Sequence, residues 1–338
     1  MSFEVAGSSP ESGSRDGSRP GGLAQRVLRA GSRLGRRLAW RHYSTARAYY
    51  LTRLRLLGPP QDPIVVYTVG KVGSTTISRS LVASGVKRTI HHVHWLVPER
   101  LADCDAFYRA ADRRHRGTAR ALRFRPGFVW LGQYVSRQIG LEPNRQWQVV
   151  TLVRDPLARN ASAFFQNLGS FFDYWIEQEI AAKGVERVAQ ELVTLFVDAY
   201  VKGTVPTAVD GDPISWFEQE LQPVFGVDVY CAPFPRHEGF EIYESANARV
   251  LVLRLEDLEA CAERAFQRFL GLENYRPARS NVGERKPYAA VYKRFLELIR
   301  LPEEYLEYLY NSRYCTHFYT QSELAGFRAR WRGERCRG

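Results

Sequence analysis

Two stretches of this chain place cationic and hydroxyl side chains directly after an apolar run. In the first, IVVYTVGKVGSTTISRSL (residues 64–81), Lys71 stands between two glycines and is followed by hydroxyl residues where a helical pattern begins. The glycines and hydroxyl residues of this junction are Gly70, Gly73, Ser74, Thr75 and Thr76. Glycines let backbone N–H groups turn inward, and a helix N-terminus and a lysine add positive potential. The junction therefore predicts an anion-binding site.

The order of residues distinguishes this junction from the nucleotide-triphosphate loop GxxxxGK[ST]. Lys71 precedes Gly73 instead of following it, and no Ser or Thr directly follows a lysine to hold magnesium. The alternative interpretation is a tight strand–helix turn with a surface lysine.

The second stretch is VVTLVRDPLARNASAFF (residues 149–165). Arg154 ends its apolar run, and Ser162 lies eight residues later, two turns into the expected helix. A guanidinium offers paired donors and a hydroxyl offers a third, which suits a phosphate monoester. The alternative is an Arg154–Asp155 pair that caps the helix, with Pro156 as the first helical residue.

An alternation of strands and helices must position these residues. The apolar runs Ile64–Val69, Val149–Val153 and Val250–Leu253 predict parallel strands covered on both faces, and Arg88–His94 and Gly127–Leu131 predict weaker ones. The expected helices are Thr75–Ala83, Pro156–Asn167, Tyr174–Val201, Pro213–Leu221, Glu256–Leu270, Tyr288–Ile299, Pro302–Asn311 and Gln321–Trp331. This pattern predicts an α/β fold, a three-layer open parallel sheet flanked by helices, with a helical C-terminal region. Ligands bind such sheets at the carboxyl ends of the strands.

Charge and composition divide the 338 residues into three parts. The formal net charge is +12, but eleven arginines and only three acidic residues lie within the first 60 residues. The basicity therefore belongs mainly to an N-terminal arm, and no nucleic-acid groove is expected. We predict a disordered tail at 1–22, a basic amphipathic helical arm at 23–58 and a domain at 62–332 that contains both stretches.

The N-terminal arm is relevant to the location of the protein in the cell. Residues 23–57 carry apolar residues at near-helical spacing among arginines, a pattern that is compatible with peripheral contact with an anionic membrane. The alternatives are a helix packed on the domain and a solvated one. No apolar stretch approaches the roughly 20 residues that span a bilayer, and the N-terminus lacks the apolar core of a signal peptide. The five cysteines are dispersed without CxxC spacing. We expect a cytoplasmic protein, or one peripheral at the inner face of the membrane.

Together, the two anion-binding stretches resemble those of the P-loop sulfotransferases. In that superfamily, a strand–loop–helix of the type TVGKVGSTT binds the 5′-phosphosulfate of 3′-phosphoadenosine 5′-phosphosulfate (PAPS). A later RDPxxRxxSxF segment, here residues 154–164, binds the 3′-phosphate of the donor. Four further stretches resemble a bacterial branch named for capsular polysaccharide synthesis: residues 216–230, 250–258, 281–295 and 309–324. The resemblance covers about Asp62 to Trp331 and implies a sulfotransferase-like domain at 62–332. It is more specific for the donor than for the acceptor.

The resemblance implies roles for individual residues. Lys71 would contact the bridging oxygen and the 5′-phosphate, with the amides and hydroxyls of the junction completing the cradle. Arg154 and Ser162 would bind the 3′-phosphate. Arg285 and Lys286, in GERKPY, resemble the late basic loop that closes over it; the alternative is an ordinary charged turn. No metal is expected, because PAPS carries no β- and γ-phosphates.

A general base should take the proton of the acceptor hydroxyl. The candidate stretch is TIHHVHWLVPER (residues 89–100), in which strand alternation puts His92 and His94 on one face and His91 on the other. His94 is our first candidate, His92 the second and Glu99 the third. The alternatives are histidines that only pack and, more weakly, a metal site, since further ligands are lacking nearby.

The sequence thus predicts a PAPS-dependent sulfotransferase that acts on a carbohydrate or glycolipid hydroxyl, in the assembly of envelope or capsule polysaccharide. Two alternatives remain open. A nucleotide-dependent kinase is disfavoured because GK[ST] and a Walker-type aspartate are missing, and a non-catalytic membrane-associated scaffold would use the basic arm as its working part. The aromatic residues that would either wall an acceptor cleft or belong to the core are Phe171, Phe172, Trp175 and Trp216.

Overall fold

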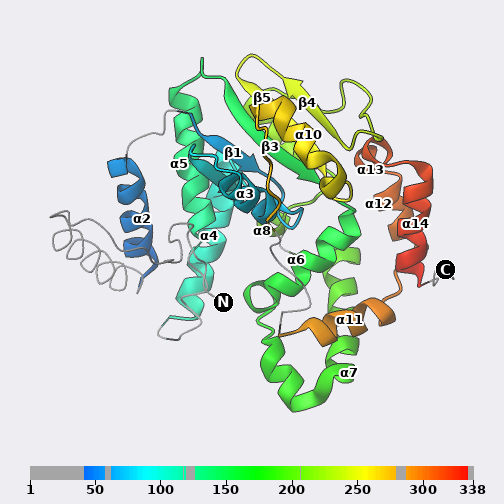
Figure 1. Cartoon of the computed structure of the whole chain (residues 1–338). Helices are drawn as coiled ribbons and strands as arrows, with labels where there is room; N and C mark the ends of the chain where they lie inside the picture. Colours follow the sequence, from blue (N-terminus) through cyan, green and yellow to red (C-terminus); the bar gives the residue numbers. More distant parts are fainter. Residues whose placement is uncertain are drawn as a thin grey trace, which may run out of the picture.

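A five-stranded sheet with helices on both faces forms the centre of the protein (Figure 1). This computed structural model describes residues 42–57, 62–116, 118, 126–205, 207–278 and 287–333. The strands are β1 (Ile64–Tyr67), β2 (Ile90–Val93), β3 (Trp147–Val153), β4 (Phe240–Glu244) and β5 (Ala248–Arg254). The helices before β4 are α2 (Tyr43–Leu57), α3 (Ser74–Ala83), α4 (Pro98–Arg114), α5 (Gly127–Leu141), α6 (Pro156–Phe171), α7 (Ile176–Phe196), α8 (Thr207–Asp210) and α9 (Gln222–Phe225). After β5 come α10 (Leu258–Leu270), α11 (Ala289–Leu298), α12 (Glu303–Tyr310), α13 (Arg313–Phe318) and α14 (Gln321–Arg332).

The order of the strands places two strand ends side by side. The order is β2-β1-β3-β5-β4; the first four strands run parallel, and β4 pairs antiparallel with β5. From β1 the chain moves outward to β2, and it then crosses to β3 on the other side of β1. This reversal is a topological switch point, the place where open α/β sheets bind ligands. The carboxyl ends of β1 and β3 flank it.

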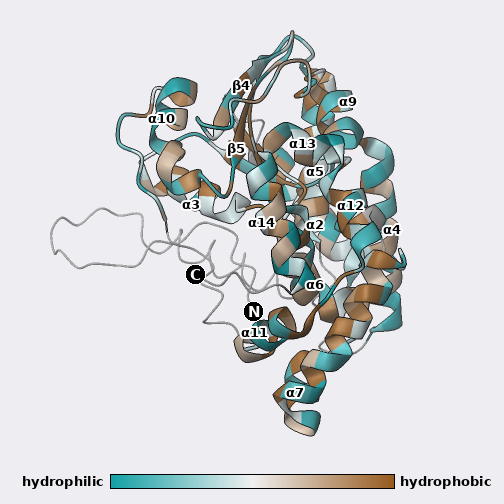
Figure 2. Ribbon diagram, turned by 90° about the vertical axis from the view of Figure 1, so that its right-hand side faces the viewer, coloured by the Kyte–Doolittle hydropathy of each residue, from teal (hydrophilic) through white to brown (hydrophobic). Residues whose placement is uncertain are grey.

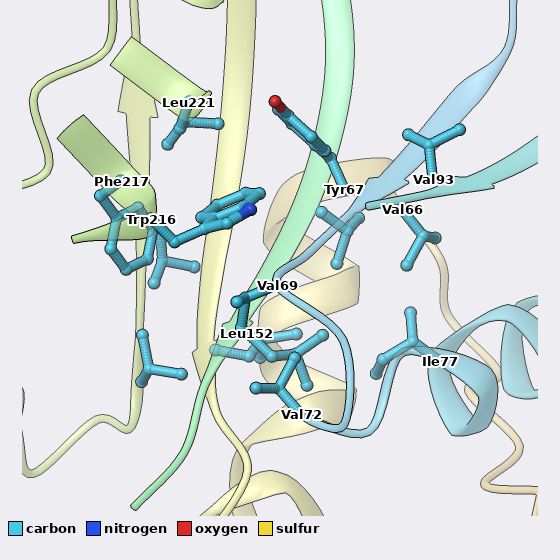
Figure 3. Packing of buried hydrophobic residues seen from close by; sticks show 14 of the residues in the cluster. Val66, Tyr67, Val69, Val72, Ile77, Val93, Leu152, Trp216, Phe217 and Leu221 are labelled. Atoms are coloured by element: carbon cyan, nitrogen blue, oxygen red, sulfur yellow. The ribbon is translucent and has the colours of Figure 1, made fainter. Parts of the chain in front are cut away.

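The predicted α/β class and a sheet flanked by helices are confirmed. β1, β2, β3 and β5 each overlap a predicted strand, whereas the antiparallel edge strand β4 was not predicted. Figure 3 shows how β1 is covered on both faces, with Val66 turned toward Ile77 of α3 and Tyr67 toward Trp216 and Leu221. Strands covered in this way have no solvent face, which explains their continuous apolar sequence. In Figure 2 the central strands are coloured as hydrophobic, while the surrounding helices carry both colours.

The strand predicted at Gly127–Leu131 is wrong, because these residues begin helix α5. The buried residues of α5 include Val129, Trp130 and Val135, which lie on different sides of the helix, because α5 packs among α2, α4 and β2. A short apolar run is compatible with either a buried strand or a buried helix. Here the predicted run is the start of a helix that extends for 15 residues after Pro126.

The helical C-terminal region is present as α11 to α14. The side chain of Thr320 accepts a hydrogen bond from the amide of Glu323, and the Glu323 carboxylate accepts one from the amide of Thr320. This capping box starts α14 as the sequence predicts. Helices α7 and α11 lie together at one end of the molecule (Figures 1 and 2), with the rings of Phe196 and Phe295 5.5 Å apart.

The last part of the predicted arm, residues 43–57, forms helix α2, which packs on the domain. The hydroxyl of Tyr43 donates to Oδ1 of Asp105 at 2.8 Å, and the rings of Tyr43 and Tyr50 lie 5.5 and 5.6 Å from that of Trp130. The tail at 1–22 and the rest of the arm lie outside the described residues. No helix in the part of the chain that the structure describes is long and apolar enough to cross a bilayer.

Because α2 covers Trp130, two truncated proteins should differ in stability. A chain that begins at Asp62 loses the bond from Tyr43 to Asp105 and exposes Trp130, so its free energy of unfolding should fall below that of a chain that begins at His42 by at least about 3 kcal/mol. Urea denaturation of both chains measures the difference. Equal midpoints would show that α2 contributes nothing to the stability of the domain.

Candidate active site

The loop after β1 is held in an unusual backbone conformation. Gly70, Lys71 and Gly73 have φ angles of 84°, 63° and 93°, a left-handed region that only glycine adopts freely. The side chains of Val69 and Val72 are buried and anchor the loop, as Figure 3 shows. A Cβ atom on Gly73 would lie 2.6 Å from the Leu255 side chain, so position 73 has no room for one. The loop thus turns tightly into α3, whose first helical bond joins the Ile77 amide to the Gly73 carbonyl.

Arg159 of α6 holds this loop in place through hydrogen bonds to its backbone carbonyls. Its buried guanidinium donates to the carbonyls of Val69 and Gly70 at 3.0 and 3.2 Å and to the Asp210 carboxylate at 2.9 Å. Nη1 also donates to the carbonyl of Gly211 at 3.2 Å. These bonds connect the β1 loop, α6 and the end of α8 in one polar network.

Arg154, the anion-binding residue predicted in the second stretch, lies at the end of β3 and contacts the same loop. Its Nη1 donates to the Lys71 carbonyl at 2.8 Å. The alternative Arg154–Asp155 pair is absent from the described residues, because Asp155 instead caps α6 by accepting from the amide of Leu157 at 3.1 Å. The hydroxyl of Tyr314 accepts from the Arg154 amide and donates to its carbonyl, both at 2.9 Å, and so fixes the backbone from which the guanidinium extends.

Ser162 occupies the face of α6 that turns toward the loop. Arg159, Ser162 and Gln166 are spaced by three and four residues and therefore share one side of the helix. Arg159 contacts the Gly70 carbonyl, and the Lys71 ammonium donates to the side-chain oxygen of Gln166. Ser162 lies between these two contacts and is half-buried. The structure thus brings Lys71, Arg154 and Ser162 to one side of the switch point.

His94 lies directly beside the glycine of the loop. Its Nδ1 is 2.8 Å from the Thr68 carbonyl, which can only accept, so Nδ1 carries the proton and Nε2 presents a lone pair. Ring atoms of His94 lie 3.6 Å from where a Cβ of Gly70 would stand. Burial, reinforced by the positive charges of Arg159 and Lys71, lowers the pKa of His94 to about 4. The imidazole is therefore neutral at physiological pH.

The other candidate bases are less well placed. His92 packs against His94 with ring centroids 4.9 Å apart, and burial lowers its pKa to about 3. Its Nε2 is buried without a hydrogen-bond partner in the described residues. His91 is directed to the opposite face of the sheet, beside Tyr134, and Glu99 is exposed in the first turn of α4. Across the described residues, no three His, Cys, Asp or Glu side chains gather as a metal-ligand set.

The remaining predicted residues separate into three groups. Trp216 belongs to the core, since it is 3% exposed and its Nε1 donates to the His94 carbonyl. Trp175 packs on Gly169, whereas Phe171 and Phe172 are half-buried at the end of α6. Arg285 and Lys286 lie outside the described residues.

Sequence reasoning missed four residues that hold the loop: Thr68, Arg159, Gln166 and Asp210. Arg159 lies in the RDPxxR stretch, five residues after Arg154, and this position in the expected helix was the signal that could have identified it. Asp210 lies 51 residues from Arg159, and no sequence pattern indicated that the two would meet.

The described fold and site are those of an α/β protein with cationic side chains gathered at a switch point. Residues 205–320 match the model of a family described as "Putative capsular polysaccharide synthesis protein". This match includes α8, β4, β5 and the C-terminal helices to α13, and it does not include the loop after β1. No curated protein and no solved structure matches this chain.

Replacing Arg159 should destabilise the protein strongly. Arg159→Ala leaves the Asp210 carboxylate buried without its cation and frees two loop carbonyls, so unfolding should become easier by about 3–5 kcal/mol. Arg187→Ala is the matched control, because it breaks an exposed pair with Glu191 worth less than about 1 kcal/mol. Urea denaturation compares the two variants, and equal losses would contradict the role assigned to Arg159.

Proposed function

We propose that this protein is a PAPS-dependent sulfotransferase that transfers a sulfuryl group to a hydroxyl of a carbohydrate or glycolipid. The observation that carries the proposal is the meeting of two strand ends at the switch point, where the Arg154 guanidinium bonds the Lys71 carbonyl. The partial match to a family named for capsular polysaccharide synthesis supports a saccharide acceptor and a role in envelope or capsule assembly. We place the reaction in the cytoplasm or at the inner face of the membrane.

The two ends of the site suit the two charged ends of this donor. Lys71, the turn at Gly73 and the first turn of α3 would receive the 5′-phosphosulfate, since amides at a helix start and an ammonium both favour anions. Arg154 and Ser162, presented by β3 and α6, would receive the 3′-phosphate. In the described residues Arg154 forms no ion pair with a carboxylate, so its charge is available to an anionic ligand.

The chain's own groups can then carry the transfer. The acceptor oxygen attacks sulfur while the bond from sulfur to the bridging phosphate oxygen breaks, and the products are a sulfate ester and adenosine 3′,5′-bisphosphate. Charge builds on the leaving oxygen, where the Lys71 ammonium would stabilise it. Nε2 of His94 would take the hydroxyl proton. A weak base suffices, because a loose transition state places little charge on the attacking oxygen until late in the step.

Isothermal titration calorimetry tests the donor class directly. The protein should bind adenosine 3′,5′-bisphosphate without magnesium and more tightly than it binds ATP. Arg154→Ala should weaken this binding by at least about tenfold, the cost of one charge-assisted contact of roughly 1.5 kcal/mol or more. Lys202→Ala, which breaks only an exposed pair with Asp198, is the control. Tighter binding of ATP that requires magnesium would replace this proposal with a kinase.

Lys71 should matter more to turnover than to binding. Lys71→Ala should slow transfer from radiolabelled PAPS to envelope polysaccharide by about 100-fold or more, because the charge on the leaving oxygen develops only in the transition state. Its affinity for adenosine 3′,5′-bisphosphate should fall far less. Equal losses in rate and affinity would mean that Lys71 only anchors the ligand.

The pH profile tests the base. A base must be unprotonated, and the pKa of His94 is lowered to about 4, so the rate should stay level from pH 8 to 6 and fall only as pH drops toward 4. His94→Ala should reduce turnover and leave nucleotide affinity unchanged, whereas His237→Ala, at an exposed imidazole, should change neither. A rate that halves near pH 6.5 and a fully active His94→Ala variant would each transfer the role to another group.

A further inference from the structure

A groove runs between the C-terminal half of α4 and the end of α6. It encloses about 230 Å³. Helix α4 and the turn after it contribute Phe107, Ala110, Ala111, Arg114 and His115, and the end of α6 and the following turn contribute Gly169, Ser170, Phe171, Phe172 and Asp173. The roles proposed for Lys71, Arg154, Ser162 and His94 do not use these side chains.

Two series of contacts connect the walls of the groove to residues of the candidate active site. On α6, the Lys71 ammonium contacts Gln166, and Gly169 and Ser170 follow one helical turn later on the same face. On the other wall, the ring of His94 lies 5.6 Å from that of Phe128, which lies 5.8 Å from that of Tyr108. Tyr108 is the neighbour of the groove residue Phe107. On α6 the groove therefore begins about one helical turn beyond Gln166, the residue that the Lys71 ammonium contacts.

The lining combines apolar faces with polar groups at the rim. Phe107 and Phe171 are half-buried and meet edge to face at 5.7 Å, and Phe172 lies beside them. Arg114 offers donors at one wall, while the Asp173 carboxylate, which accepts from Trp175 Nε1, offers an acceptor at the other. A sugar ring presents C–H groups on its faces and hydroxyls that both donate and accept around its edge, which matches this combination. An acyl chain would use only the apolar faces and make no hydrogen bond to Arg114 or Asp173.

We infer that this groove binds a saccharide ring of the acceptor, with Phe171 and Phe107 as its apolar platform. The inference rests on the proposed function and specifies where the acceptor lies. Gly169 contributes to the shape of the groove, because a Cβ at this position would lie 3.1 Å from the Trp175 ring that packs behind it.

The test separates acceptor binding from donor binding. Wild-type protein is applied to an array of bacterial capsular and lipopolysaccharide glycans, each in free and in lipid-linked form, and nucleotide affinity is measured in parallel by calorimetry with adenosine 3′,5′-bisphosphate. Phe171→Ala should weaken retention on the array by about tenfold, since an aromatic contact is worth roughly 1 kcal/mol or more. Ala110→Trp, at an exposed lining position, should block the groove without opening the core. Tyr308→Ala, at a ring that is 63% exposed on α12, is the control and should retain glycans normally.

Each result decides the inference. The inference is supported if the wild-type protein retains glycans, both groove variants lose this retention, and the nucleotide affinity of the variants is unchanged. The inference is overturned if the wild-type protein retains no glycan, or if both groove variants retain as much glycan as the wild-type protein. Retention of lipid-linked glycans alone would assign the groove to an acyl chain instead. Glycan binding that depends on Phe171 in a protein that does not bind the nucleotide would keep the groove and remove the proposed donor.

Discussion

The buried ion pair between Arg159 and Asp210 is the contact on which the rest of the site depends. Burying two charges costs several kcal/mol, and the cost is offset only where the remaining donors and acceptors are also bonded. Arg159 meets this condition by donating to the carbonyls of Val69 and Gly70 as well as to the carboxylate. The same bonds hold Lys71 in its left-handed conformation, which costs a residue with a side chain about 1 kcal/mol or more. The Arg159 guanidinium therefore fixes the path of the loop and the backbone position from which the Lys71 side chain extends.

The C-terminal helices hold the second strand end in a comparable way. Tyr314 of α13 bonds both the amide and the carbonyl of Arg154, and Tyr310 of α12 donates to Asp155 at 2.8 Å. Burial raises the pKa of Asp155, and the Tyr310 hydroxyl opposes this rise by stabilising the carboxylate. The first turn of α6 and the position of Arg154 therefore depend on side chains about 160 residues later in the chain. This explains why a helical region after the last strand belongs to the site.

The sequence allowed prediction of those features that depend on neighbouring residues. The ends of β1 and β3 were predictable because a buried strand followed by Gly70 and Lys71, or by Arg154, is a local pattern. Residues 127–131 were assigned wrongly because a short apolar run has no period that separates strand from helix. The partnership of Arg159 with Asp210 was not predictable, since only the fold brings them together. For the same reason aromatic residues expected in one cleft divide between the core and the groove.

The electrostatics of the switch point connect the loop, the histidine and the ligand. Burial lowers the pKa of His94 most, and the charges of Arg159 and Lys71 lower it further, which means that the site carries positive potential at the imidazole. That potential disfavours a proton on His94 and favours an anion beside it, so in the proposed sulfotransferase one charge distribution would keep the base neutral and attract the donor. Binding of an anion would reduce this positive potential, whereas burial, the main cause of the lowered pKa of His94, would remain. In the proposed sulfotransferase the imidazole would therefore stay unprotonated with the donor bound, in the form that can take the proton of the acceptor hydroxyl.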